Sequence, residues 1–231
     1  MNQPREPKGA PGGTGGRFKE NPAGGVSGLP GLDMHIPLTV AGHRVNALPV
    51  GSAPLDGCPV TSQPKEFFRL DRGRQSAVAF RDCLRESRKH RLVGAAVDVH
   101  PVEDYEDCDL YVTENGRTGF ALRGDELISV FSTKGEHGGD AAVAQAVRQG
   151  ARRLDCFDIH GRLPAFYARH GFRPIARVVW DDEYAPDGWP AELGRPDVVA
   201  MAVTDNPPDT PPVVEYDEAL LMAARAADEK R

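Results

Sequence analysis

Residues 126–172 contain an ordered series of four segments that leaves few folds open to this chain. The first, ELISVFST, is apolar, β-branched and of strand length. After a glycine-containing breaker at residues 134–139, alanines and valines recur at helical spacing up to Gly150, which can end a helix. ARRLDCFD is strand-like again, and LPAFYARHGF carries an apolar helical stripe that ends at a glycine. The series predicts a β-α-β-α unit.

The breaker between the first strand and the first helix predicts an anion-binding site. A strand, a glycine loop and a helix N-terminus bring unpaired backbone N–H groups and the positive end of a helix dipole to one point. These groups suit a pyrophosphate. Many α/β proteins turn on glycines without binding anything, so a plain turn remains the alternative at this stage.

A family resemblance adds to this interpretation. FYARHGFRPIAR resembles the end of the acetyl-CoA site in the GNAT family of N-acetyltransferases, where a strand, a pyrophosphate loop, a helix, a strand and a helix ending in aromatic-x-x-x-Gly-Phe follow in order. The family's Q/R-x-x-G-x-G/A loop matches EHGGDA at Gly139 and Ala141, whereas Glu136 replaces the Gln or Arg. DDEYAPDGW and GRPDVVAM resemble a variant found in phage and mobile elements. The resemblance covers about residues 72–203.

The resemblance implies an acyl-CoA-dependent transfer of an acetyl group to an amine by direct attack. The strand at residues 128–132 is expected to splay from the strand at residues 154–157, with the thioester in the gap. Tyr167 is expected to protonate the leaving thiolate. Backbone groups of the first strand would bind the pantetheine arm and polarise the thioester carbonyl. The implied acetyl-CoA site comprises Val130, Phe131, Ser132, Lys134, His137, Gly138, Gly139, Asp140 and Ala141.

Several alternatives stay open at the level of sequence. The general base is not specified, and Asp158, Asp182 and Glu183 are candidates by their position near strand ends and the last loop. Tyr167 can equally be a packing aromatic. Glu136 and Asp140 bring negative charge toward a phosphate, which favours a second hypothesis: a catalytically degenerate GNAT-fold protein that binds a partner.

Other reactive side chains predict less. Asp155, Asp158, His160 and His137 lack the H-E-x-x-H spacing or any other recognised ligand spacing, so no metal site is predicted. Cys156 is expected to be a small core residue of a strand rather than a nucleophile paired with His160. The four cysteines show no C-x-x-C spacing, which predicts unpaired thiols and a reducing, cytoplasmic setting.

Charge and hydropathy limit the partners. The net charge of −6 argues against sequence-independent nucleic-acid binding and mildly favours a cationic amine as acceptor, either a small molecule or a macromolecule. No apolar run reaches the roughly 18 residues of a membrane span, and no apolar leader is visible, so a cytoplasmic protein is expected. The oligomeric state is not readable, and a dimer stays open.

The fold class predicted is α/β (α+β), a GNAT-like mixed, mostly antiparallel twisted sheet with flanking helices. Residues 1–33 read as a disordered Gly/Pro-rich tail, residues 34–71 as short strands and a loop, residues 72–204 as the GNAT-like domain, and residues 205–231 as a Pro-rich linker with a C-terminal helix. The elements expected around the β-α-β-α unit are a helix at 74–91, a strand or extended segment at 92–99, a hairpin of 109–113 with 118–123 around Asn115-Gly116, strands at 173–180 and 197–203, and a helix at 216–231.

Overall fold

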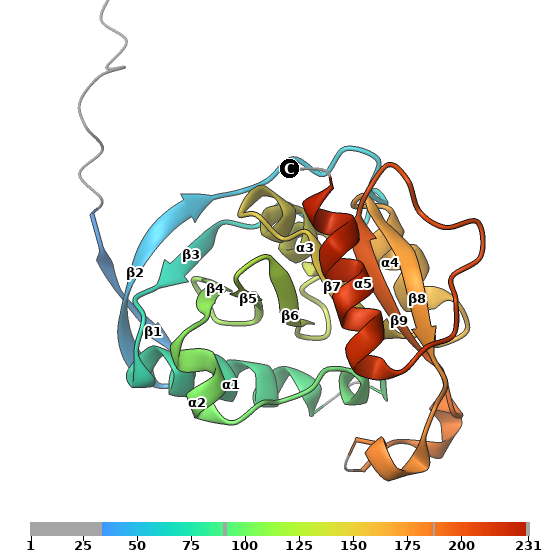
Figure 1. Cartoon of the computed structure of the whole chain (residues 1–231). Helices are drawn as coiled ribbons and strands as arrows, with labels where there is room; N and C mark the ends of the chain where they lie inside the picture. Colours follow the sequence, from blue (N-terminus) through green and yellow to red (C-terminus); the bar gives the residue numbers. More distant parts are fainter. Residues whose placement is uncertain (1–33, 90–91, 187, 230–231) are drawn as a thin grey trace, which may run out of the picture. The chain divides into compact units, whose positions relative to one another are not determined.

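The computed structural model describes residues 34–89, 92–186 and 188–229, and the predicted tail at residues 1–33 lies outside them. Within the described residues a nine-stranded sheet is flanked by five α helices (Figure 1). The strands are β1 Ile36–Val40, β2 His43–Gly51, β3 Phe67–Leu70, β4 Asp109–Thr113, β5 Thr118–Arg123, β6 Glu126–Ser132, β7 Arg153–Phe157, β8 Phe172–Val178 and β9 Val198–Val203. The helices are α1 Arg74–Arg88, α2 Val102–Glu106, α3 Gly139–Arg148, α4 Arg162–Ala168 and α5 Tyr216–Asp228.

The sheet is mixed and mostly antiparallel, as the sequence predicts. Its strands follow the order β1-β2-β3-β4-β5-β6-β7-β9-β8. Every neighbouring pair is antiparallel except β6 and β7, which are parallel and joined through α3. A parallel pair needs a crossover connection, and α3 supplies it. The predicted β-α-β-α unit therefore lies at the one parallel step of the sheet.

The predicted hairpin is confirmed with its predicted bounds. β4 and β5 pair in antiparallel register around the turn at Asn115 and Gly116. Gly116 has φ +66°, a conformation in which glycine carries no steric penalty. The Thr113 hydroxyl donates to Asn115 Oδ1 at 2.8 Å and links the strand end to the turn.

The helices cover the two faces of the sheet differently. On one face α1 and α2 pack over the strands up to β6, with Phe80 of α1 at 5.1 Å from Tyr105 and 5.6 Å from Phe131 between ring centroids. On the same face α5 packs its alanines against β8 and β9. On the other face α3 and α4 pack against β5, β6 and β7 around a core that includes Leu154 and Cys156 (Figure 1).

Two local expectations need correction. Residues 92–99 do not form a strand, because Leu92–Ala96 is a 3₁₀ helix in which Gly94 packs closely on the end of α1. The Arg88 side chain fixes this turn by donating to the Gly94 carbonyl at 2.8 Å. Helix α1 ends at Arg88, and residues 90–91 of the predicted helix lie outside the described residues.

The sheet opens between β6 and β7. Within the described residues the two strands share a single ladder pair, Glu126 with Arg153, and then separate. β6 also has a bulge, since its register with β5 shifts near Ser129, which has φ +52°. A left-handed φ on a non-glycine residue is strained and occurs preferentially at functional sites. This bulge lies on the strand that separates from β7.

Candidate functional site

The loop from β6 to α3 is built around a close glycine contact. Gly138 donates its N–H to Ser132 Oγ at 3.2 Å, and Ser132 Oγ lies 3.2 Å from the Thr118 hydroxyl. A Cβ on Gly138 would lie 2.6 Å from Thr118 Oγ1, which is closer than side chains approach. Glycine is therefore required at position 138 by packing, and this packing fixes where α3 begins.

Glu136, which departs from the family pattern, is neutralised by neighbouring cations. Its carboxylate lies 3.0 Å from Lys65 Nζ and 3.2 Å from Arg117 Nε. The hydrogen bond from Lys65 is the main reason that the pKa of Glu136 is lowered. The carboxylate is thus charged and paired, so it does not present an isolated negative charge to the end of α3.

Asp140 in the first turn of α3 is also paired. It accepts hydrogen bonds from Ser62 Oγ at 2.6 Å and from Arg169 at 3.0 Å, and His170 Nε2 lies 3.0 Å from its Oδ1. Burial opposes its charge, but these hydrogen bonds outweigh burial and leave the pKa of Asp140 below its ordinary value. Asp140 acts as an anchor between α3, the end of α4 and the segment 52–66.

The segment 52–66 reaches the same loop, which the sequence did not predict. The Gln63 N–H donates to the His137 carbonyl at 3.4 Å, and Arg148 donates to the Ser52 carbonyl at 2.7 Å. Of the residues implied for the cofactor site, those exposed are Lys134 and His137, and those buried include Gly138, Asp140 and Ala141. The backbone at the start of α3 is therefore partly covered by this segment.

Val130 and Phe131 of β6 send their side chains to opposite faces. Val130 packs with the α3 and α4 layer, whereas Phe131 packs on Phe80 of α1. Because β6 and β7 have separated at this point, the backbone edge of these residues that faces β7 has no ladder partner within the described residues. Such an edge can pair with an extended ligand.

Tyr167 lies on the α4 side of β7. Its half-buried ring packs edge-on against Phe166 and Phe172, at 5.0 and 6.1 Å between centroids. Its hydroxyl makes no hydrogen bond to any residue that the structure describes. Burial, followed by the proximity of Cys156 and Asp155, raises the pKa of Tyr167. The phenol is therefore protonated at neutral pH and free to donate to a ligand.

The carboxylates proposed as bases from the sequence have other partners. Asp158 accepts from the Gly161 N–H at 2.8 Å and lies 3.1 Å from Arg177, so it holds the turn that precedes α4. Glu183 lies exposed in the short 3₁₀ helix Asp182–Tyr184. Asp182 lies 2.7 Å from Arg195. These contacts give Asp158 and Asp182 structural roles, and neither residue needs to be the general base to account for them.

Asp155 is a further candidate base, which the sequence did not indicate. It lies on β7 between Leu154 and Cys156, whose side chains point into the α3 and α4 layer, so the Asp155 side chain points to the opposite face. Its closest hydrogen-bond partner there is the Tyr216 hydroxyl of α5, at 3.4 Å. Burial, followed by the charges of Glu126 and Asp98, raises the pKa of Asp155 to about 6. The available sequence signal was a carboxylate inside an otherwise apolar strand.

Aromatic side chains continue this face beyond Asp155. Phe157 lies two positions along β7. Its ring centroid is 4.7 Å from that of Trp189 and 5.9 Å from that of Trp180, and the centroids of the two indoles lie 5.1 Å apart. Trp189 donates to the Gly194 carbonyl at 2.8 Å, which holds the loop in place. An aromatic wall beside several carboxylates suits a cation.

The cysteines behave as the sequence predicts in that the structure pairs none of the four. Cys156 is buried with its Sγ 3.9 Å from the sulfur of Met201, and burial raises its pKa. A buried thiol with a raised pKa is a poor nucleophile. Cys156 is therefore a core residue.

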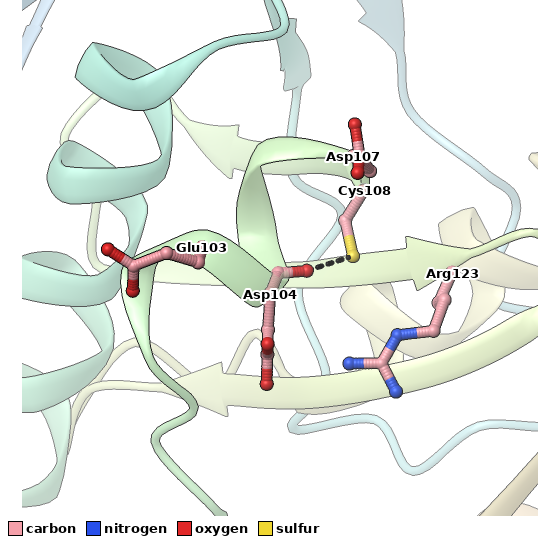
Figure 2. A pocket seen from close by; sticks show the side chains of 5 residues that line it. All are labelled: Glu103, Asp104, Asp107, Cys108 and Arg123. Atoms are coloured by element: carbon pink, nitrogen blue, oxygen red, sulfur yellow. Dashed lines mark hydrogen bonds between the residues drawn. The ribbon is translucent and has the colours of Figure 1, made fainter.

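A separate hollow lies between α2 and β5 (Figure 2), lined by Glu103, Asp104, Asp107, Cys108 and Arg123. The Cys108 thiol donates to the Asp104 carbonyl at 3.1 Å, and Glu103 lies 3.0 Å from Arg74. These contacts are local and satisfy the groups that make them. The hollow has no feature that indicates a ligand.

Comparison of the chain with protein-family models, with curated proteins and with solved structures found no match. Among the helices in the described residues, none is both long enough and apolar enough to cross a membrane.

Proposed function

We propose that this protein is an N-acetyltransferase that moves an acetyl group from acetyl-CoA to a cationic amine. The observation that carries the proposal is the opening of the sheet after the single pair of Glu126 with Arg153. This opening leads directly to the glycine loop and the N-terminus of α3. An extended thioester arm in the opening would meet unpaired backbone groups along its length, and its phosphates would lie toward a helix N-terminus.

Local charge supports cofactor binding despite the acidic loop. The carboxylates of Glu136 and Asp140 are balanced by Lys65, Arg117 and Arg169, each within 3.2 Å of its partner. Three cations against two carboxylates leave the vicinity of α3 slightly positive. A pyrophosphate approaching the backbone of Gly139 then meets no net repulsion.

In the proposed reaction the amine nitrogen attacks the thioester carbonyl carbon, the C–N bond forms and the C–S bond breaks. Asp155 takes the proton from the amine, directly or through one water, because a carboxyl with a pKa of about 6 is ionised at neutral pH and still a useful base. Tyr167 donates its proton to the departing sulfur. Backbone N–H groups near Val130 and Phe131 stabilise the charge on the carbonyl oxygen.

The acceptor follows from the side of the sheet on which Asp155 lies. Glu126 and Asp98 are close enough to shift the pKa of Asp155, and Phe157 continues the same face toward two tryptophans. Carboxylates and aromatic rings together favour an alkylammonium group. We therefore expect amines that carry a second positive charge to be the preferred acceptors.

The test is release of free CoA thiol from acetyl-CoA in the presence of a panel of amines, including diamines, polyamines and a lysine peptide. The proposal expects saturable, amine-dependent thiol release, with charged acceptors preferred over neutral amines of the same size. Absence of amine-dependent release across the panel, in protein shown to be folded by circular dichroism, would reject it.

One observation favours a second function, a partner-binding protein without catalysis. The segment 52–66 covers part of the start of α3, with contacts from Ser62 to Asp140 and from Gln63 to His137. A covered helix N-terminus cannot hold a pyrophosphate unless the segment moves. Folded protein that neither binds acetyl-CoA nor releases thiol would support this second function.

A further inference from the structure

Three side chains that can ligate metals converge at the start of α3. They are Cys58 of the segment 52–66, Asp140 of the first turn of α3, and His170 just after α4. Their ligand atoms all lie within 4.8 Å of one another. These residues are far apart in the sequence, so folding alone brings them together, and no spacing motif could reveal them.

The distances are close to those of a coordination shell. Zinc binds sulfur at about 2.3 Å and nitrogen or oxygen at about 2.0–2.2 Å, so neighbouring ligands in a tetrahedron lie roughly 3.3–3.7 Å apart. His170 Nε2 already lies 3.0 Å from Asp140 Oδ1. On coordination this pair would open slightly, and Cys58 Sγ would move inward from within 4.8 Å.

Two of the three side chains are shielded from water, and the third, Cys58, is half-buried. The His170 side chain is 5% exposed and the Asp140 side chain 11%. Ser62 Oγ, at 2.6 Å from Asp140, adds a hydroxyl next to the three ligands. Arg169 also bonds to Asp140, but its guanidinium lies over the Phe166 ring at 5.2 Å from the centroid, and this contact remains if an ion takes the carboxylate.

We propose that Cys58, Asp140 and His170 bind one divalent transition-metal ion, with zinc as the best match. A thiolate, an imidazole and a carboxylate form a donor set that suits zinc and disfavours magnesium and calcium. On binding, the Cys58 thiol releases its proton to solvent, and a water or the Ser62 hydroxyl completes the tetrahedron. The ion would tie the segment 52–66 to α3 and to the end of α4. The site does not depend on the proposed acyltransferase activity.

Cobalt(II) is the probe, because it reports both geometry and thiolate ligation. Full-length protein, reduced and treated with chelator, is titrated with Co²⁺ and then with Zn²⁺. The proposal expects one Co²⁺ per chain, the visible absorption of a tetrahedral site with a thiolate-to-cobalt charge-transfer band, and loss of both signals when Zn²⁺ displaces cobalt.

Variants separate this site from adventitious binding. Cys58→Ser should abolish the charge-transfer band, and His170→Gln should weaken Co²⁺ binding at least tenfold. Cys108→Ser is the matched control, because serine keeps the hydrogen bond to the Asp104 carbonyl, and it should leave the spectrum unchanged. Circular dichroism of each metal-free variant checks folding. Absence of a stoichiometric cobalt spectrum in folded wild-type protein, or an unchanged band in Cys58→Ser, would overturn the proposal.

Discussion

Two carboxylates on opposite faces of the sheet differ in the groups around them. Asp140, at the start of α3, is surrounded by donors and a cation, and its pKa is lowered. Asp155, on β7, is half-buried near other carboxylates with one tyrosine hydroxyl at 3.4 Å, and its pKa is raised to about 6. Paired donors thus make a carboxylate an anchor, whereas desolvation near like charges leaves a carboxylate that can exchange a proton near neutral pH.

The largest expected effect comes from Asp155→Asn, which removes the proposed base. A general base contributes roughly 10²–10⁴-fold, so kcat/KM for the amine should fall by that order while acetyl-CoA affinity stays the same. Asp209→Asn, at an exposed position, is the control and should match the wild type. Steady-state kinetics measure both variants. Normal turnover of Asp155→Asn would show that Asp155 is not the general base.

Tyr167→Phe tests the acid on the other side of β7. Its hydroxyl has no protein partner in the described residues, so the substitution should cost little stability. We expect the rate of CoA release to fall roughly 10- to 100-fold with acetyl-CoA affinity unchanged, because a positioned acid acts mainly in the transition state. Thiol-release kinetics measure the rate, and calorimetric titration measures the affinity for acetyl-CoA. If the variant is fully active, Tyr167 is a packing residue only.

Replacing Asp140 and replacing Asp155 by asparagine should change the free energy of unfolding in opposite directions. Asp140→Asn weakens bonds to Arg169, His170 and Ser62 and should lower the free energy of unfolding by about 1–3 kcal/mol at pH 7. Asp155→Asn removes a half-buried charge that folding disfavours and should raise the free energy of unfolding by about 1–2 kcal/mol at the same pH. Urea unfolding of both variants measures these changes.

The pH dependence supplies the check on those signs. Asp140 has a lowered pKa, so its contribution is present above the unfolded-state value of 3.8 and is lost as pH falls through the folded pKa. Asp155 has a raised pKa, so the gain from Asp155→Asn should grow as pH rises from about 4 through about 6. A change of the same sign in the free energy of unfolding for both variants at pH 7 would contradict the opposite roles of Asp140 and Asp155.

The smallest effect is expected from Glu136→Gln. Because Lys65 and Arg117 already pair with this carboxylate, removal of its charge should improve acetyl-CoA affinity by less than about threefold, as for a partly exposed ion pair. Calorimetric titration of the variant beside the wild type measures the ratio. A gain of tenfold or more would mean that Glu136 faces the phosphates instead of its basic partners.

The sequence predicted features that local patterns determine. The β4–β5 hairpin depends on one turn, and the β6–α3–β7–α4 unit on apolar periodicity and glycines. Features set by contacts between distant segments were missed. Helix α2 has only five residues, and the strand Phe67–Leu70 is completed by pairing with β2 and β4, so neither has a strong local signal.

The site was predictable in part for the same reason. Tyr167 and the glycine loop lie inside a continuous stretch of chain with a recognisable order. The partners of Glu136 and Asp140 come from other segments, so the pairing by Lys65 and Ser62 could not be read from the sequence. Asp155 required knowing which face of β7 is covered by α5 and which by α4.

Binding of acetyl-CoA to the wild-type protein is the first requirement of the proposed acetyltransferase activity. Isothermal titration calorimetry with full-length protein should show one saturable site per chain, with affinity in the micromolar range typical of cosubstrates. Dephosphorylated and truncated forms, such as pantetheine alone, should bind more weakly because they lack the phosphates that the start of α3 would hold. Absence of any saturable heat up to millimolar acetyl-CoA, with folded protein in the cell, would contradict the account.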